Sequence, residues 1–278
     1  MAFPYEKYLR VEHFPHIWCA GCGHGIILKA ILRAIDSLEL DKNEVAIASG
    51  IGCASRLPGY VDFNTLHTTH GRALAFATGI KLSRPELKVI VVSGDGDAIA
   101  IGGNHFLHAC HRNIDMTLII FNNYNYGMTG GQYSPSTPYG SYTTTTPYGN
   151  PHYEFDFLEL AKAAGATYVA RATTYHARLL SKLIAGAIEH KGFAVVEVLE
   201  DCPTAYGRRN DMRSPAQMLK RWKDLCITFE AMKKLPPEKT KGKIPIGLYH
   251  KETRPDFWEE YQEVVKKAKL LARQEGGT

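Results

Sequence analysis

Strand-like and helix-like segments alternate along this chain from about residue 25 to residue 198, and this alternation constrains the fold most. The strand-like segments, such as KVIVVSG and TLIIFNN, are continuous apolar runs, typical of strands buried on both faces of a parallel sheet. The sequence therefore predicts an α/β fold with a doubly wound, mostly parallel sheet. We expect strands at 44–49, 87–93, 115–123, 167–170 and 193–198, and helices at 25–38, 71–83, 103–111, 155–164 and 174–189.

The composition changes after residue 202. The stretch KKLPPEKTKGKIPIG is too rich in Pro and Lys to carry a core, and the chain ends in an amphipathic helical pattern. We expect one domain over residues 1–202 and a C-terminal helical and irregular appendage over 203–278 that packs on the domain or on a partner. About thirty residues of Gly, Pro, Ser, Thr and Tyr follow residue 123, and we expect 130–152 to act as a lid.

Composition also limits the environment and the partners. The net charge of +5 is mild and spread along the chain, which argues against nucleic acid as a partner. No apolar run is long enough to span a membrane, and the start MAFPYEKYLR lacks the apolar core of a signal peptide. We therefore expect a cytoplasmic protein whose six cysteines are reduced thiols.

Two polar residues follow neighbouring strands of the predicted sheet. Asp95 lies in SGDGD, where Gly94 and Gly96 allow close approach of a phosphate, and Asn123 comes 28 residues later, about one crossover unit. Carboxylate and amide oxygens suit Mg²⁺, and the backbone carbonyl of Asn125 can complete the protein's share. Each piece alone is more often a turn without a ligand, but the joint spacing favours a magnesium site.

Four cysteines lie in loops that can converge at one end of the sheet. Cys19 and Cys22 form a C-x-x-C pair, whereas Cys53 and Cys202 each follow a predicted strand. A four-thiolate site suits an iron–sulfur cluster, and the scattered third and fourth cysteines fit zinc less well. Zinc, or simple burial of Cys53 and Cys202, stays open on spacing alone.

Several motifs together resemble the β subunits of 2-oxoacid:ferredoxin oxidoreductases, most closely the 2-oxoglutarate type. They are WCAGCGHGIILKAILRAI, SGIGCASRLPGY, LHTTHGRALAFATGIKL, SGDGDAIAIGGNHF and IIFNNYNYGMTGGQYSPSTP, in this order. The resemblance implies that residues 1–202 form a thiamine diphosphate-binding domain with a [4Fe–4S] cluster on Cys19, Cys22, Cys53 and Cys202. It also implies that Mg²⁺ is bound by Asp95, Asn123 and the carbonyl of Asn125.

The same resemblance assigns further residues to the cofactor. Gly94, Gly96, Asp97 and Gly127 are expected against the diphosphate, and His70 is expected to donate a hydrogen bond near it. A second group is expected against thiamine or substrate: Ile51, Gly52, Cys53, Ala54 and Met128. Arg56 is expected to pair with a substrate carboxylate. For His70, Arg56 and Met128 a purely structural role stays open.

The implied activity is oxidative decarboxylation of 2-oxoglutarate with coenzyme A to succinyl-CoA and CO₂, with electrons passing through the cluster to ferredoxin. The reaction can also run as reductive carboxylation. The chain holds only the diphosphate-binding module, so an α subunit is expected to complete the site. Three alternatives remain: the same chemistry on pyruvate or another 2-oxoacid, a non-redox thiamine carboligase or decarboxylase, and a zinc-stabilised interaction module.

Overall fold

One eight-stranded sheet forms the centre of the computed structural model, which describes residues 3–212 and 214–275. Its strand order is β2-β1-β3-β4-β6-β5-β8-β7, and the first six strands are parallel. The last two run against them, because β8 pairs antiparallel with β5 and β7 pairs parallel with β8. The strands are β1 (Val45–Ser49), β2 (Asn64–His67), β3 (Lys88–Gly94), β4 (Met116–Asn122), β5 (Tyr168–Thr173), β6 (Phe193–Leu199), β7 (Cys226–Thr228) and β8 (Ile244–Lys251).

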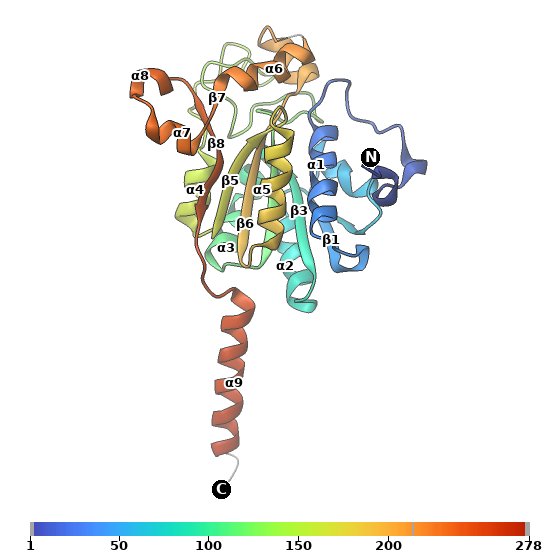
Figure 1. Cartoon of the computed structure of the whole chain (residues 1–278), viewed down its shortest axis with the longest axis vertical. Helices are drawn as coiled ribbons and strands as arrows, with labels where there is room; N and C mark the ends of the chain where they lie inside the picture. The colour runs from blue at the N-terminus through green and yellow to red at the C-terminus, as the bar shows by residue number, and fades with distance from the viewer. Residues whose placement is uncertain (1–2, 213, 276–278) are drawn as a thin grey trace.

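Helices cover both faces of the sheet, as a doubly wound fold requires (Figure 1). One face packs against α1 and α5, and the other packs against α2, α3 and α4. The helices are α1 (His24–Ser37), α2 (Ala73–Ser83), α3 (Gly103–His111), α4 (Phe157–Ala164), α5 (Ala177–Glu189), α6 (Pro215–Leu225), α7 (Phe229–Lys234), α8 (Pro237–Thr240) and α9 (Phe257–Glu275). The predicted doubly wound, mostly parallel sheet is confirmed.

Two hydrophobic cores lie on the two faces of the central strands. Successive residues of a strand point to opposite faces, so Leu118 and Ile120 join one core while Ile119 and Phe121 join the other. All seven residues of β4 and of β6 are buried. This is why these strands read as continuous apolar runs in the sequence.

Four strands of the sheet depart from the sequence prediction. β2, β7 and β8 were not predicted, because β2 is short and largely exposed, β7 has three residues, and β8 begins within the stretch rich in Pro and Lys. β5 continues past residue 170 to Thr173, because the charge of Arg171 is paired with the buried carboxylate of Glu197 on β6, with Nε and Oε2 2.6 Å apart. Pairing inside the sheet thus allows a charged residue in a strand.

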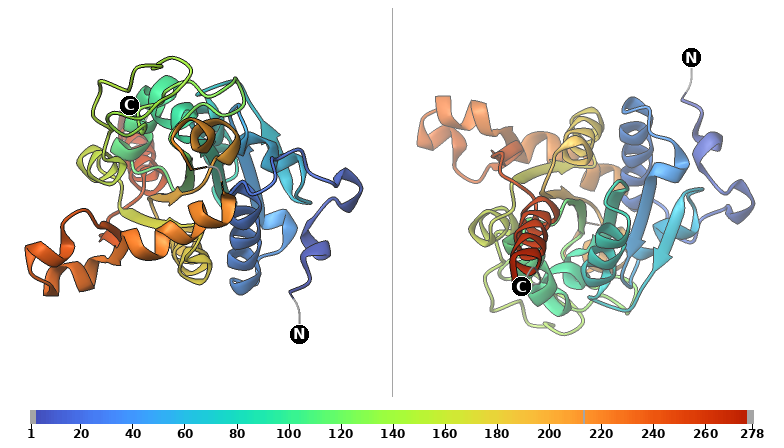
Figure 2. Two further views of the ribbon diagram at one scale, coloured as in Figure 1. Left: turned by 90° about the horizontal axis from the view of Figure 1, so that it is seen from above. Right: turned by 90° about the horizontal axis from the view of Figure 1, so that it is seen from below.

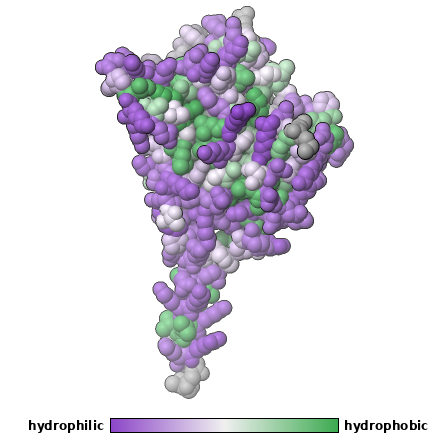
Figure 3. Space-filling model, viewed as in Figure 1, coloured by the Kyte–Doolittle hydropathy of each residue, from purple (hydrophilic) through white to green (hydrophobic). Residues whose placement is uncertain are grey.

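The segment after residue 202 joins the sheet and then leaves it. β8 lies along β5, and α6 lies with the 124–156 loop over the same end of the sheet (Figures 1 and 2). α9 projects away from the body, and its exposed apolar side chains include Tyr261, Val264, Leu270 and Leu271 (Figures 1 and 3). Among residues 3–212 and 214–275, no helix combines the length and apolar character needed to cross a bilayer.

The buried central strands should dominate the stability of the fold. Leu118 in β4 is fully buried, so Leu118→Ala should lower the free energy of unfolding by about 2–5 kcal/mol. Leu107 in α3 is 42% exposed and provides the matched control, for which we expect about 1 kcal/mol or less. Chemical denaturation of the two variants beside the wild type measures both values. Equal losses would contradict this placement of the core.

Candidate functional site

The carboxyl ends of four adjacent strands meet at one edge of the sheet and supply most of the site. β1, β3, β4 and β6 are neighbours and parallel, so the loops that follow them lie side by side. The residues after β1, β2, β3 and β4, together with His24, line a pocket of about 110 Å³. It is lined by His24, Ile51, Gly52, Cys53, Ala54, His70, Gly94, Asp95, Gly96, Asp97, Asn123, Asn125, Tyr126, Gly127, Met128 and Thr129.

Asp95 is a buried carboxylate at the end of β3. Its Oδ2 accepts hydrogen bonds from the hydroxyls of Ser134 and Ser136, each at 2.5 Å, which brings the 124–156 loop against the pocket. Burial raises the pKa of Asp95 to about 6, although both hydroxyls act in the opposite direction. A buried carboxylate that accepts hydrogen bonds from neutral hydroxyls is well suited to hold a cation.

Asp97 is also buried, but its carboxylate is saturated by protein donors. Oδ1 accepts from the backbone N–H groups of Gly71 at 2.7 Å and Ile51 at 3.2 Å, and from Nδ1 of His70 at 2.5 Å. Oδ2 accepts from the Ser93 hydroxyl at 2.5 Å. Asp97 therefore ties together the loops after β1, β2 and β3.

The glycines of the GDGD turn fit their sites for different reasons. A Cβ at Gly94 would meet no atom within 4 Å, so this backbone is open to the pocket that it lines. A Cβ at Gly96 would lie 2.3 Å from the ring of Tyr126, whose hydroxyl donates to the Gly96 carbonyl at 3.2 Å. Gly96 is thus required by the packing of Tyr126 as well as by the predicted approach of a phosphate.

Two amides occupy the end of β4 beside Asp95. Nδ2 of Asn123 donates to Oε1 of Glu200 at 3.2 Å, and Nδ2 of Asn125 donates to the Asn123 carbonyl at 2.8 Å. Asn123, Asn125 and Glu200 are all buried. The predicted oxygen ligands are thus brought to adjacent strand ends, with Asn123 held by a carboxylate that the sequence analysis did not single out.

The predicted cysteines converge from three separate loops. A Cβ placed on Gly127 would lie 3.5 Å from Sγ of Cys53 and 3.7 Å from Sγ of Cys202. Burial raises the pKa of Cys22, Cys53 and Cys202, and the charge of Glu200 raises all three further, joined by other cysteines in the case of Cys22 and Cys53. For Cys53 the pKa reaches about 12, and Cys19 is among the neighbours that contribute. A cationic cluster or metal would relieve this cost by taking the thiolates as ligands.

The C-x-x-C turn is held in place from both sides. Nε1 of Trp18 donates to the Cys53 carbonyl at 2.8 Å, and the N–H of Gly23 donates to the Asp201 carbonyl at 3.2 Å. Gly21 has φ +81°, and a Cβ there would lie 2.3 Å from the ring of Pro215 in α6. The helix α6, from the predicted appendage, therefore closes over the cysteine site.

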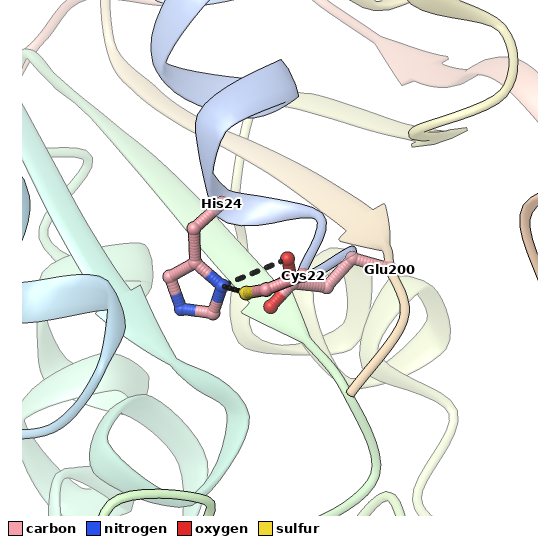
Figure 4. A group of neighbouring side chains, drawn as sticks. All are labelled: Cys22, His24 and Glu200. Carbon is pink, nitrogen blue, oxygen red and sulfur yellow. Dashed lines mark hydrogen bonds and ion pairs between the residues drawn. The ribbon is translucent and has the colours of Figure 1, made fainter. Parts of the chain in front are cut away.

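His24 and Glu200 form a buried pair beside Cys22 that the sequence analysis missed. Nδ1 of His24 lies 2.8 Å from Sγ of Cys22 and 3.1 Å from Oε2 of Glu200 (Figure 4). The two side chains come from the start of α1 and the residue after β6. Their only signals in the sequence are adjacency to Cys22 and Cys202 and the strand-end position of Glu200.

The other predicted residues are placed as follows. Ile51, Gly52, Ala54, His70 and Met128 line the pocket, and the Ile51 and Met128 side chains are 41% and 42% exposed. Arg56 is exposed and is not among the pocket-lining residues. Its role toward a substrate carboxylate stays a prediction.

Comparisons with known proteins agree with this geometry. Residues 48–198 match the family model described as thiamine pyrophosphate enzyme, C-terminal TPP binding domain. The chain is 50% identical over 266 residues to 2-oxoglutarate synthase subunit KorB of Methanocaldococcus jannaschii, covering 96% of this chain and 98% of that protein. It is 48% identical over 264 residues to the subunit of the same name from Archaeoglobus fulgidus, covering 95% of each.

A solved structure is also similar. It is a 2-oxoglutarate:ferredoxin oxidoreductase from Magnetococcus marinus with 2-oxoglutarate, coenzyme A and succinyl-CoA bound. The TM-score is 0.84 and the sequence identity is 36%, over 96% of this chain and 91% of that one.

Asp97 should be a structural hub of the pocket. Asp97→Ala leaves the buried N–H of Gly71 and the partly buried N–H of Ile51 without their acceptor, at roughly 1–3 kcal/mol for each unpaired amide. Asp97→Asn keeps an acceptor oxygen, and Ser93 can accept from the new amide. We expect thermal unfolding to show a much larger loss for Ala than for Asn. Similar losses would mean that charge, rather than hydrogen bonding, is what Asp97 supplies.

Asp95 should destabilise the unliganded chain above pH 6. Its pKa is about 6 in the folded chain against an ordinary value of 3.8, so the unfolded state releases the proton first and stability falls as pH rises from about 4 to 6. Asp95→Asn should be more stable than the wild type above pH 6, by up to about 3 kcal/mol, and equal to it below about pH 4. Unfolding across this pH range tests the sign, and a variant less stable at pH 7 would contradict it.

Proposed function

The chain belongs to the thiamine pyrophosphate enzymes and, within them, to the KorB subunits of 2-oxoglutarate synthase, and we propose that it forms the β half of an enzyme that converts 2-oxoglutarate, coenzyme A and oxidised ferredoxin to succinyl-CoA, CO₂ and reduced ferredoxin. One observation carries the proposal. Gly127 lines the pocket that holds Asp95 and Asn123, and the sulfurs of Cys53 and Cys202 lie against the same residue. A diphosphate site and a thiolate site therefore share a wall.

The residues at the ends of β3 and β4 fit magnesium and the diphosphate. Asp95 and the side-chain oxygen of Asn123 supply hard oxygen ligands, and we assign the third to the carbonyl of Asn125. The open backbone at Gly94 suits a phosphate close by. Asp97 supports the site indirectly, since its carboxylate holds His70 and the N–H of Ile51 in the pocket wall.

The four cysteines fit a [4Fe–4S] cluster. The pKa values of Cys22, Cys53 and Cys202 are raised by burial and by the charge of Glu200, so these thiols are costly to ionise without metal, and a cluster would bind them and Cys19 as thiolates. Zinc uses the same ligand type. The shared wall with the pocket favours a redox group, because a structural zinc site would gain nothing from lying there.

Each protein group then has a definite task. When bound, thiamine diphosphate would supply carbanion chemistry at the 2-oxoacid, and the [4Fe–4S] cluster would supply single-electron transfer. His70, held by Asp97, presents its ring at the pocket and is assigned a hydrogen bond to the diphosphate side. Met128 and Ile51 provide apolar surface for thiamine or substrate, and we assign Arg56 to a substrate carboxylate.

The partners follow from what this chain provides. It contains one doubly wound module, so we propose that an α subunit completes the cofactor site, with ferredoxin as the electron acceptor. The six cysteines are free thiols, which suits the reducing cytoplasm that we propose as the location.

Anaerobic purification of the complex with its α subunit tests the proposal directly. We expect about four irons per β chain, a brown colour, and bleaching of that colour when 2-oxoglutarate and coenzyme A are added together. Pyruvate and coenzyme A serve as the matched control and should bleach it far more slowly. One zinc per chain and no bleaching would contradict the proposal, whereas faster bleaching with pyruvate would change only the substrate.

A further inference from the structure

Glu200 lies between the two predicted metal sites and contacts Asn123 of one and His24, the neighbour of Cys22, at the other. Its Oε1 accepts from Nδ2 of Asn123 at 3.2 Å, and its Oε2 lies 3.1 Å from Nδ1 of His24. The side chain of Glu200 is fully buried and that of His24 is 1% exposed. Burying a carboxylate costs free energy, so a buried carboxylate between two sites indicates a functional role.

We propose that Glu200 is a positioning residue for both sites: it orients Asn123 toward the magnesium ion, orients His24 toward Cys22, and places one negative charge between the cation and the cluster. This inference rests on the proposed function, because it assigns a role toward the cofactors named there. It adds one residue, outside both sets of predicted ligands, through which a change at the magnesium site would affect the cysteine site.

On the magnesium side, Glu200 fixes which end of the Asn123 amide faces the ion. A carboxylate accepts hydrogen bonds and does not donate them, so it selects the NH₂ end of the amide. Oδ1 of Asn123 is then left to face the ion, while it also accepts from Nδ2 of Asn125 at 3.3 Å. Among the side chains that the structure describes, Glu200 is the acceptor for Nδ2 of Asn123, so its removal takes away one of the two contacts that orient this amide.

On the cysteine side, Glu200 fixes the ring of His24. Nδ1 faces both Sγ of Cys22 at 2.8 Å and Oε2 of Glu200, whereas Nε2 lies on the far side of the ring and has no hydrogen-bond partner among the residues that the structure describes (Figure 4). Two acceptors on one side favour the proton on Nδ1. His24 then donates to the sulfur of Cys22, and donors to cluster sulfurs raise the reduction potential.

The charge of Glu200 acts on the two sites in opposite senses. It favours a cation held by Asp95 and Asn123, and it opposes an added electron on the cysteine side. The same charge raises the pKa of Cys22, Cys53 and Cys202 and also that of Asp95, which agrees with a position close to all four groups.

Glu197 provides a matched control three residues earlier. It is also buried, it lies on β6, and its Oε1 accepts from Nδ2 of Asn122 at 2.7 Å. Its other oxygen is paired with Arg171, away from the cysteines. Glu197→Gln therefore removes a buried carboxylate with an asparagine partner but leaves both metal sites unchanged.

The experiment compares the α–β complex carrying Glu200→Gln or Glu197→Gln with the wild type. Three quantities are measured: iron content, the magnesium dependence of thiamine diphosphate binding, and the midpoint potential of the cluster in an EPR-monitored titration. For Glu200→Gln we expect full iron, about 10- to 100-fold weaker magnesium affinity, and a higher midpoint potential. Glu197→Gln should match the wild type in all three.

A second comparison isolates His24. His24→Leu is made in the Glu200→Gln background, so that no buried carboxylate is left without a partner. Loss of the donor to Cys22 should lower the midpoint potential below that of Glu200→Gln alone, with no further change in magnesium affinity. A purely structural role for the pair would not give shifts of opposite sign.

Each outcome decides between the inference and the function on which it rests. A wild-type complex without iron, or without magnesium-dependent cofactor binding, overturns both. A normal wild type with unchanged magnesium affinity and potential in Glu200→Gln overturns only the inference, as do equal shifts in Glu197→Gln. If Glu200→Gln does not assemble, Glu200→Asp carries the test: it keeps the charge but draws back from Asn123, and unchanged magnesium affinity would then overturn the inference.

Discussion

Parallel pairing of β1, β3, β4 and β6 is the constraint on which the site depends. Parallel strands end on the same side of the sheet, so four loops far apart in the sequence are brought together without any direct signal between them. The strands are buried on both faces, which makes their register rigid. The loops can therefore carry Gly, Asn and Cys, which do little for stability, because the sheet fixes where each loop begins.

Buried negative charge is concentrated at this end of the molecule, and its partners differ in kind. Asp97 is neutralised largely by backbone N–H groups and His70, and Glu197 is paired with Arg171. Asp95 accepts only hydroxyl hydrogen bonds among side chains, and burial raises its pKa. The difference separates carboxylates that hold the fold together from the one that we propose as a ligand of a cation.

Much of the fold was readable from the sequence, because apolar periodicity reports strands and helices buried in a core. The predicted strands ending at Ser49, Gly94 and Leu199 are present to within one residue, and the convergence of Cys53 and Cys202 followed from those strand ends. β8 was not predicted because it lies near the edge of the sheet and is only partly buried, which leaves a weak apolar pattern in the sequence. His24 and Glu200 were missed because a buried His–Glu contact looks, in the sequence, like two ordinary polar residues beside the predicted ligands.

Gly127 lines the pocket and lies beside the sulfurs of Cys53 and Cys202 with no side chain of its own between them. Any other residue would place a Cβ within 4 Å of both sulfurs. The rate of electron transfer falls steeply with distance, and a glycine keeps two groups on either side of the backbone as close together as a polypeptide allows. In the function that we propose, the missing side chain would keep the path for electron transfer short, and a methyl group at this position would contact Cys53, Cys202 and the side chain of Asn125.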